Sequence, residues 1–118
     1  MPNKLLVVLF AGPESACKLQ HAILFARDVV QRGGQAAVIL EGASPAWLPG
    51  FVDKSDKLTS FFAKAIDENL IAGVCKACAG AANATEAAEA LGLALLSDAF
   101  GHASMDSYIT NDYTIMAL

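Results

Sequence analysis

The sequence predicts a single α/β domain over residues 1–118, built on a parallel β-sheet. Short apolar runs, several of them rich in β-branched side chains, alternate along the chain with longer stretches of helical periodicity. The runs are continuously apolar, which is typical of strands that are buried on both faces, as in a parallel sheet. A length of 118 residues also suits one domain with its own hydrophobic core.

The first forty residues predict a strand, a helix and a second strand. Residues 4–10 are almost entirely apolar and form the first predicted strand. In residues 16–32, apolar side chains recur at three- and four-residue spacing, which predicts a helix that Gly33 and Gly34 end. Residues 35–40 form the second strand. We therefore expect a right-handed βαβ unit at the start of the chain.

Residues 41–52 are predicted to be a loop, because they contain two prolines and two glycines. They also hold Trp47, the single tryptophan of the chain. In such a segment a tryptophan can line a pocket, sit in a contact between subunits or cover the edge of the core. The sequence leaves these three interpretations open.

The rest of the chain continues the alternation, and the whole gives five strands with four helical regions, typical of a doubly wound sheet. In order, the predicted elements are a helix over 56–69, a strand over 70–74, an alanine-rich helix over 77–91 that Asn83 interrupts, a strand over 93–96, a weak helix over 104–111 and a strand over 113–118. Ligands of such sheets bind at the carboxyl ends of the strands, so the loops of interest are residues 11–15, 41–50, 75–80 and 97–103.

Charge and hydropathy exclude several classes of function. The formal net charge is −4 and the eight Lys and Arg residues are scattered, so we expect neither nucleic acid nor an anionic membrane surface as a partner. No apolar run reaches the ~18 residues of a membrane span. Residues 4–10 have some character of a signal peptide, but Pro13 and Glu14 stand where a cleavage site would need small residues. We therefore predict a cytoplasmic protein.

Apolar residues make up 55% of the chain, which is high for a small domain with much surface. Either the core is very dense, or part of the surface is covered by another copy. Since exposed apolar patches usually mark interfaces, we favour a homo-oligomer.

The pair Cys75 and Cys78 is the most suggestive chemical feature. It lies where the third strand should end and a helix should begin, so the helix N-terminus and Lys76 would both favour a thiolate. The spacing also permits a reversible disulfide. The alternative is that both are small buried side chains in an alanine-rich segment. We expect no metal, because a structural zinc site needs four ligands and the sequence has neither a second CxxC nor a histidine pair, although two chains could share one.

The remaining candidates are weaker. Cys17, the third cysteine, precedes His21 by four residues on one helix face and could be activated by it, or both could lie on a helix surface or subunit contact. His102, in a glycine-containing loop, could carry protons or be solvated. Gly12 and Ser15 form a turn that enters a helix; it could bind an anion, but we interpret it as a turn with Ser15 as N-cap.

The chain resembles the DsrE/DsrF-like family of small sulfur-relay proteins and their YchN-like relatives. The resemblance rests on residues 5–14, 21–26, 34–42 and 71–78, together with the closing helix and strand. It implies a three-layer α/β/α domain whose five parallel strands have the order 4-3-2-1-5. It also implies a trimer or hexamer of identical chains, or an assembly with sister subunits.

In the sulfur-relay members of that family, a cysteine after the third strand accepts a persulfide and passes it on. Here Cys75 fits the strand end and Cys78 the helix start. The resemblance thus implies a persulfide carrier or sulfurtransferase with protein donors and acceptors of sulfur, and no cofactor. A thiol redox module using the CxxC, and a non-catalytic oligomeric binding subunit, are the alternatives.

Overall fold

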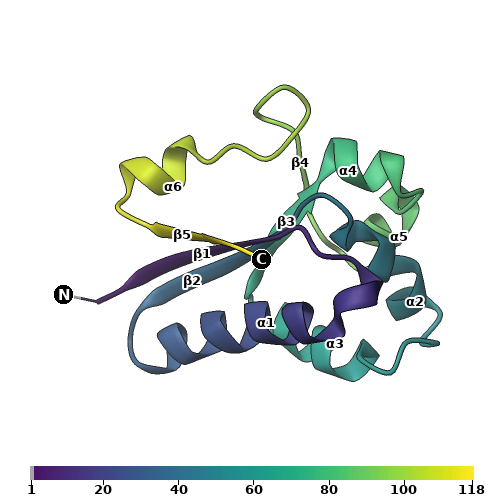
Figure 1. Ribbon diagram of the computed structural model, residues 1–118, viewed down its shortest axis with the longest axis horizontal. Helices are drawn as coiled ribbons and strands as arrows, with labels where there is room; N and C mark the ends of the chain where they lie inside the picture. The colour runs from purple at the N-terminus through teal and green to yellow at the C-terminus, as the bar shows by residue number, and fades with distance from the viewer. Residues whose placement is uncertain (1) are drawn as a thin grey trace.

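The computed structural model describes residues 2–118, in which five parallel strands form one sheet in the order β4-β3-β2-β1-β5 (Figure 1). The predicted α/β class and strand order are thus confirmed. The strands are β1 (Lys4–Leu9), β2 (Gln35–Leu40), β3 (Ile71–Cys75), β4 (Leu95–Leu96) and β5 (Thr114–Ala117). The helices are η1 (Pro13–Ser15), α1 (Ala16–Gln31), η2 (Ser44–Trp47), α2 (Leu48–Val52), α3 (Thr59–Asp67), α4 (Lys76–Ala81), α5 (Thr85–Ala90) and α6 (Asp106–Thr110).

The interior position of β1, between β2 and β5, agrees with its side chains. It pairs with β2 on one side, from Lys4↔Gln35 to Leu9↔Leu40, and with β5 on the other. Because side chains alternate between the faces of a strand, Leu5, Val7 and Leu9 enter one core while Leu6 and Val8 enter another. A strand that is covered on both faces has no polar alternation, which is the pattern seen in the sequence.

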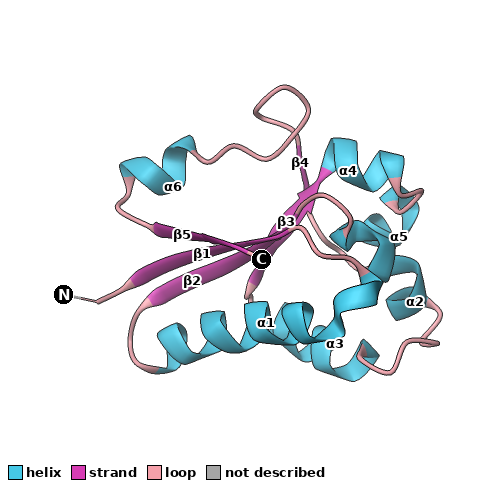
Figure 2. Cartoon of the chain, in the orientation of Figure 1, coloured by secondary structure: helices cyan, strands magenta, loops and turns pink. Residues whose placement is uncertain are grey.

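Helices flank both faces of the sheet, but unequally (Figure 2). The larger core lies between the sheet and α1, α2, α3 and α5, where Phe51 and Phe62 stack with ring centroids 4.6 Å apart. The smaller core, on the other face, is closed by Ala103, Met105 and the residues of α6 and its flanks. Nothing as long as α1 covers this second face within residues 2–118, so the segment after β4 forms much of its surface.

The predicted loop over residues 41–52 was wrong, because it contains the short helices η2 and α2. Its two prolines, Pro45 and Pro49, stand in the first turns of these helices. Proline has no backbone N–H, but in the first turn that N–H would have no hydrogen-bond partner within the helix. Trp47 is only 3% exposed and belongs to the larger core, so it covers the core edge.

The predicted interruption at Asn83 is confirmed. Asn83 has a φ of +53°, and the alanine-rich stretch divides there into α4 and α5. The strand expected over residues 93–96 is shorter than predicted, since only Leu95 and Leu96 pair with β3. Gly73 permits that pairing, because a β-carbon there would lie 2.8 Å from the Ala94 carbonyl oxygen.

Among residues 2–118, α1 is the longest helix, with 16 residues, and none of the helices has the length and hydropathy of a membrane span.

Candidate functional site

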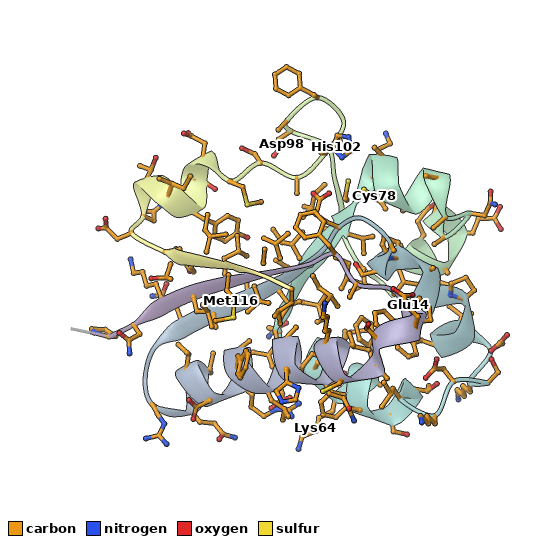
Figure 3. All side chains as sticks on the ribbon, in the orientation of Figure 1. Glu14, Lys64, Cys78, Asp98, His102 and Met116 are labelled. Atoms are coloured by element: carbon orange, nitrogen blue, oxygen red, sulfur yellow. The ribbon has the colours of Figure 1, made fainter. Side chains whose placement is uncertain are left out.

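Three neighbouring strands end at one corner of the sheet, and each contributes to a cluster of four side chains. Glu41 follows β2, Cys75 is the last residue of β3 with Cys78 one turn later, and His102 lies in the segment after β4. The ligand atoms of these four side chains lie within 4.8 Å of one another. Figure 3 labels Cys78 and His102, which lie side by side at this corner, with Lys64 far away across the sheet. We call these residues the thiol cluster.

Cys75 is the N-cap of α4. Its sulfur accepts a hydrogen bond from the backbone N–H of Cys78 at 3.4 Å. An N-cap side chain normally accepts from the N–H two or three residues later, so the CxxC spacing places Cys78 where its own N–H faces the Cys75 sulfur. Cys75 has no exposed surface. The strand end therefore buries one sulfur and gives it a fixed donor.

Cys78 is partly exposed, and its thiol donates to Glu41 Oε1 at 3.4 Å. Burial of the Cys78 sulfur raises its pKa to about 12, and the neighbouring Cys75 and Glu41 side chains act in the same direction. The Gly42 N–H opposes these effects. Cys78 is thus a protonated thiol at neutral pH, contrary to the expectation that the helix N-terminus and Lys76 would favour its thiolate.

His102 is held by a tight β-hairpin. Ala99 and His102 exchange two backbone hydrogen bonds of 2.9 Å, and the two residues between them, Phe100 and Gly101, both have positive φ. The Gly101 carbonyl accepts from the Ala77 N–H in the first turn of α4, so the hairpin is fastened to the helix that carries Cys78. This brings His102 Nδ1 to 3.1 Å from the Cys75 sulfur.

Glu41 is the member of the thiol cluster that was not predicted from the sequence. It is 8% exposed; Oε2 accepts the Ala103 N–H at 3.3 Å, while Oε1 faces Cys78 and lies 3.7 Å from His102 Nδ1. The available signal was its place directly after a buried strand, at the same sheet edge as Cys75. A charged residue at the end of β2 lies beside the end of β3, so its position alone groups it with the cysteines.

Comparison with protein-family models and with solved structures finds no match for this chain. Among curated proteins it is similar to the uncharacterized protein MJ0733 of Methanocaldococcus jannaschii. The two are 33% identical over 100 residues, which is 85% of this chain and 79% of the archaeal protein. The chain belongs to the MJ0733 family.

In this member of the family, the other predicted site residues lie outside the thiol cluster. Lys76 is exposed, and among residues 2–118 no hydrogen bond or ion pair joins it to the cluster. Cys17 and His21 do meet, with 3.2 Å between Sγ and Nδ1. The same Nδ1 lies 2.8 Å from the Cys17 carbonyl oxygen, which only accepts, so this nitrogen carries a hydrogen and is not a base for the thiol.

In the turn that contains Gly12 and Ser15, the side chain of Glu14 takes the place that an external anion would occupy. The Gly12 N–H donates to Glu14 Oε1 at 3.2 Å, so a carboxylate of the chain already occupies the donor that an external anion would use. Ser15 precedes α1 as predicted, but its side chain makes no capping hydrogen bond. These observations support the interpretation of this segment as a turn.

The hairpin that carries His102 provides a test of its geometry. Phe100 is fully exposed and has a φ of +57°, a conformation that costs most L-residues about 1–2 kcal/mol but suits asparagine before glycine in a two-residue hairpin. We expect Phe100→Asn to stabilise the protein by roughly 0.5–1 kcal/mol and to raise Tm by roughly 2–6 °C in a thermal melt.

Phe100→Ala is the matched control for this change. It removes the exposed ring but keeps a side chain with the same backbone conflict, so Tm should hardly change. Equal stabilisation by alanine and asparagine would mean that the ring, and not the backbone conformation, sets the effect.

Proposed function

We propose that this protein handles sulfur through its thiol pair, with Cys78 taking a sulfane sulfur from a persulfide donor. One observation carries the proposal: the partly exposed Cys78 thiol donates to a buried carboxylate, Glu41, while a second sulfur lies beside it. A thiol with a high pKa needs a base at the moment of attack, and Glu41 is in place to accept that proton.

The transfer balances without a cofactor. As Cys78 gives its proton to Glu41, its sulfur attacks the outer sulfur of a donor R–S–SH. The S–S bond of the donor breaks, a new S–S bond forms on Cys78, and the donor leaves as a thiolate that takes up the proton from Glu41. One S–S bond is broken and one is made: the Cys78 sulfur is oxidised as the inner sulfur of the donor is reduced, so no external oxidant or reductant is needed. An acceptor thiol would remove the outer sulfur by the same step.

A dithiol redox module is the second candidate, and the closeness of the two sulfurs favours it. Cys75 could attack the inner sulfur of a Cys78 persulfide, forming the Cys75–Cys78 disulfide and releasing H₂S. Return to the dithiol would require an external thiol reductant. Cys75 is buried and Cys78 is partly exposed, so in such a module Cys78 would meet the outside partner first.

Self-association belongs to the same proposal. Beside the thiol cluster lies an apolar groove over β1 and β5, where Phe10 and Ile115 are 48% and 37% exposed. Exposed apolar surface of this kind supports an oligomer, whose size the sedimentation velocity of the native protein would give. We assign the protein to the cytoplasm, since adjacent free thiols persist where cellular reductants are strong.

The decisive experiment is persulfide loading of the reduced, natively folded protein after treatment with a metal chelator, which leaves both thiols free. After incubation with a low-molecular-weight persulfide, peptide mass spectrometry should find one extra sulfur on Cys78, removable by reductant. The Cys78→Ser variant should lose this product, and Glu41→Gln should slow its formation because the proton acceptor is gone.

Cys17→Ser is the matched control, since Cys17 is an exposed thiol outside the cluster, and it should load normally. Formation of a Cys75–Cys78 disulfide with release of H₂S, and no lasting persulfide on Cys78, would favour the redox module. If neither cysteine reacts until the chain is denatured, thiol chemistry is excluded and a binding subunit is the better description.

A further inference from the structure

We propose that Glu41, Cys75, Cys78 and His102 form a four-ligand site for a thiophilic divalent cation, with Zn²⁺ as the natural occupant. The sequence argued against a metal because only two ligands were visible in it. The fold brings two more donors to the same corner of the sheet, and the four ligand atoms come from the ends of three neighbouring strands. Their number and chemistry match a tetrahedral zinc site.

The spacing of the donors is close to that of a tetrahedron. Zinc–ligand distances of roughly 2.0–2.3 Å place the corners of the tetrahedron roughly 3.3–3.8 Å apart. The Cys75 sulfur lies 3.1 Å from His102 Nδ1, and the Cys78 sulfur lies 3.8 Å from the same atom. Glu41 Oε1 lies 3.4 Å from the Cys78 sulfur and 3.7 Å from His102 Nδ1. Small side-chain shifts would bring all four onto one ion, and the thiols would release their protons to solvent as they bind it.

Outer contacts already orient these donors. The Ala103 N–H holds Glu41 Oε2 and leaves Oε1 to face the sulfurs. The Cys78 N–H fixes Cys75, and the hairpin fastened to α4 fixes His102. Hydrogen bonds behind the ligands are a regular feature of protein metal sites, because they set ligand orientation before the ion arrives.

The charge of the cluster also favours a cation. A nearly buried carboxylate and two thiols stand together, and among residues 2–118 the single ion-pair partner of Glu41 is the half-exposed His102 at 3.7 Å. Buried charge is costly without compensation, which two positive charges would supply. Two sulfurs and one imidazole select zinc or a similar ion, because Mg²⁺ and Ca²⁺ require shells of oxygen ligands.

This site does not depend on the proposed sulfur chemistry. A bound ion would occupy both sulfurs, so the metal-loaded protein could not accept a persulfide at Cys78. A protein that binds zinc but never carries sulfur would uphold the metal site and refute the transfer. Persulfide loading without any metal binding would uphold the transfer and refute the metal site.

The test is a Co²⁺ titration of the reduced, metal-free, full-length protein with a reductant that is not a thiol. One equivalent should give the strong visible d–d bands of tetrahedral cobalt and the near-ultraviolet charge-transfer band of thiolate ligands. One equivalent of Zn²⁺ should abolish both. Cys78→Ser should lose a large part of the charge-transfer band, and Glu41→Gln should weaken binding while keeping that band.

Cys17→Ser is again the matched control and should behave as the wild type. Far-ultraviolet circular dichroism of each variant checks that the fold is intact. The site is refuted if cobalt gives only the weak bands of its hexa-aquo ion, if Cys78→Ser leaves the spectrum unchanged, or if Cys17→Ser removes it.

Discussion

In the metal-free protein, Cys78 is expected to react with iodoacetamide roughly a hundredfold more slowly at pH 8 than a cysteine of the unfolded chain. Raising the pKa to about 12, from an ordinary value of ~8.5, lowers the thiolate fraction at pH 8 by a factor of roughly 10³. A more basic sulfur is a better nucleophile, which raises the rate per thiolate roughly 30-fold and leaves a net slowing on the order of a hundredfold.

The sign of the pH dependence is also fixed. Because the pKa is raised, the alkylation rate should still rise tenfold per pH unit at pH 9–10, where an ordinary thiol has levelled off. Rates can be followed by mass spectrometry in Cys17→Ser, which leaves only the two cluster thiols. A rate that levels off near pH 9 would contradict the assignment of Cys78 as a protonated thiol.

Glu41→Gln provides the complementary variant. Glu41 is one of the groups that raise the pKa of Cys78, so its removal should lower that pKa and speed alkylation. The same variant should slow persulfide loading, because loading near neutral pH uses Glu41 as the proton acceptor. Faster alkylation together with slower persulfide loading would distinguish an effect on the thiolate population from an effect on proton transfer. Neither assay alone makes this distinction.

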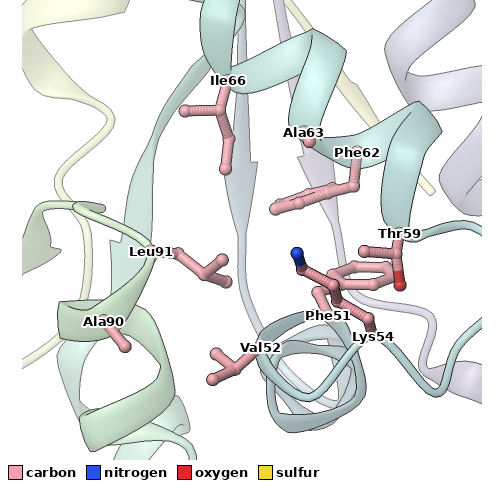
Figure 4. A pocket seen from close by; sticks show the side chains of 9 residues that line it. All are labelled: Phe51, Val52, Lys54, Thr59, Phe62, Ala63, Ile66, Ala90 and Leu91. Carbon is pink, nitrogen blue, oxygen red and sulfur yellow. The ribbon is translucent and has the colours of Figure 1, made fainter.

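The second large effect is expected in the larger core. Phe62→Ala should destabilise the protein by about 3–5 kcal/mol in denaturant unfolding, because it removes a ring that is 1% exposed. That ring stacks on Phe51, and Figure 4 shows the two beside Ile66 and Leu91 in the hollow between α2, α3 and α5. The cavity left by the ring would stay largely empty, because its walls belong to three separate helices that cannot easily move together to close it.

Phe61→Ala is the matched control, since Phe61 precedes Phe62 on the same helix but is only partly buried beside Arg27. Its cost should be clearly smaller than that of Phe62→Ala. Neither change should alter Cys78 alkylation in the folded protein, because the hollow of Figure 4 shares no lining residue with the thiol cluster. Equal losses at the two positions would mean that burial in this core is not what sets stability.

Most of the fold was predictable because its strands carry strong local signals. Residues 4–10 and 35–40 are apolar without alternation, and burial on both faces is the physical reason for that pattern. The helix over Leu48–Val52 was missed because Pro49 and Gly50 look like loop residues. Proline is favoured in a first turn, so the correct signal was present but local composition outweighed it.

The site was only half predictable for a different reason. Cys75 and Cys78 are neighbours in sequence, so their meeting is a local event that spacing alone predicts. Glu41 and His102 join them only through strand order and through a hairpin fastened by one hydrogen bond from Ala77. No local pattern encodes those contacts, and the individual side chains have many ordinary roles.

The connectivity of the thiol cluster links it to folding. Its contacts across the sheet edge join residues 24, 27, 37 and 62 positions apart, so the unfolded chain retains the CxxC pair but not the four-donor set. Any ligand that needs all four donors therefore binds the native state alone. At a free concentration a hundred times its Kd, such a ligand adds about 2.7 kcal/mol to the free energy of unfolding. Occupancy of this corner would thus act as a non-covalent cross-link between three strands, and the supply of ligand in the cell would set how long each folded molecule survives.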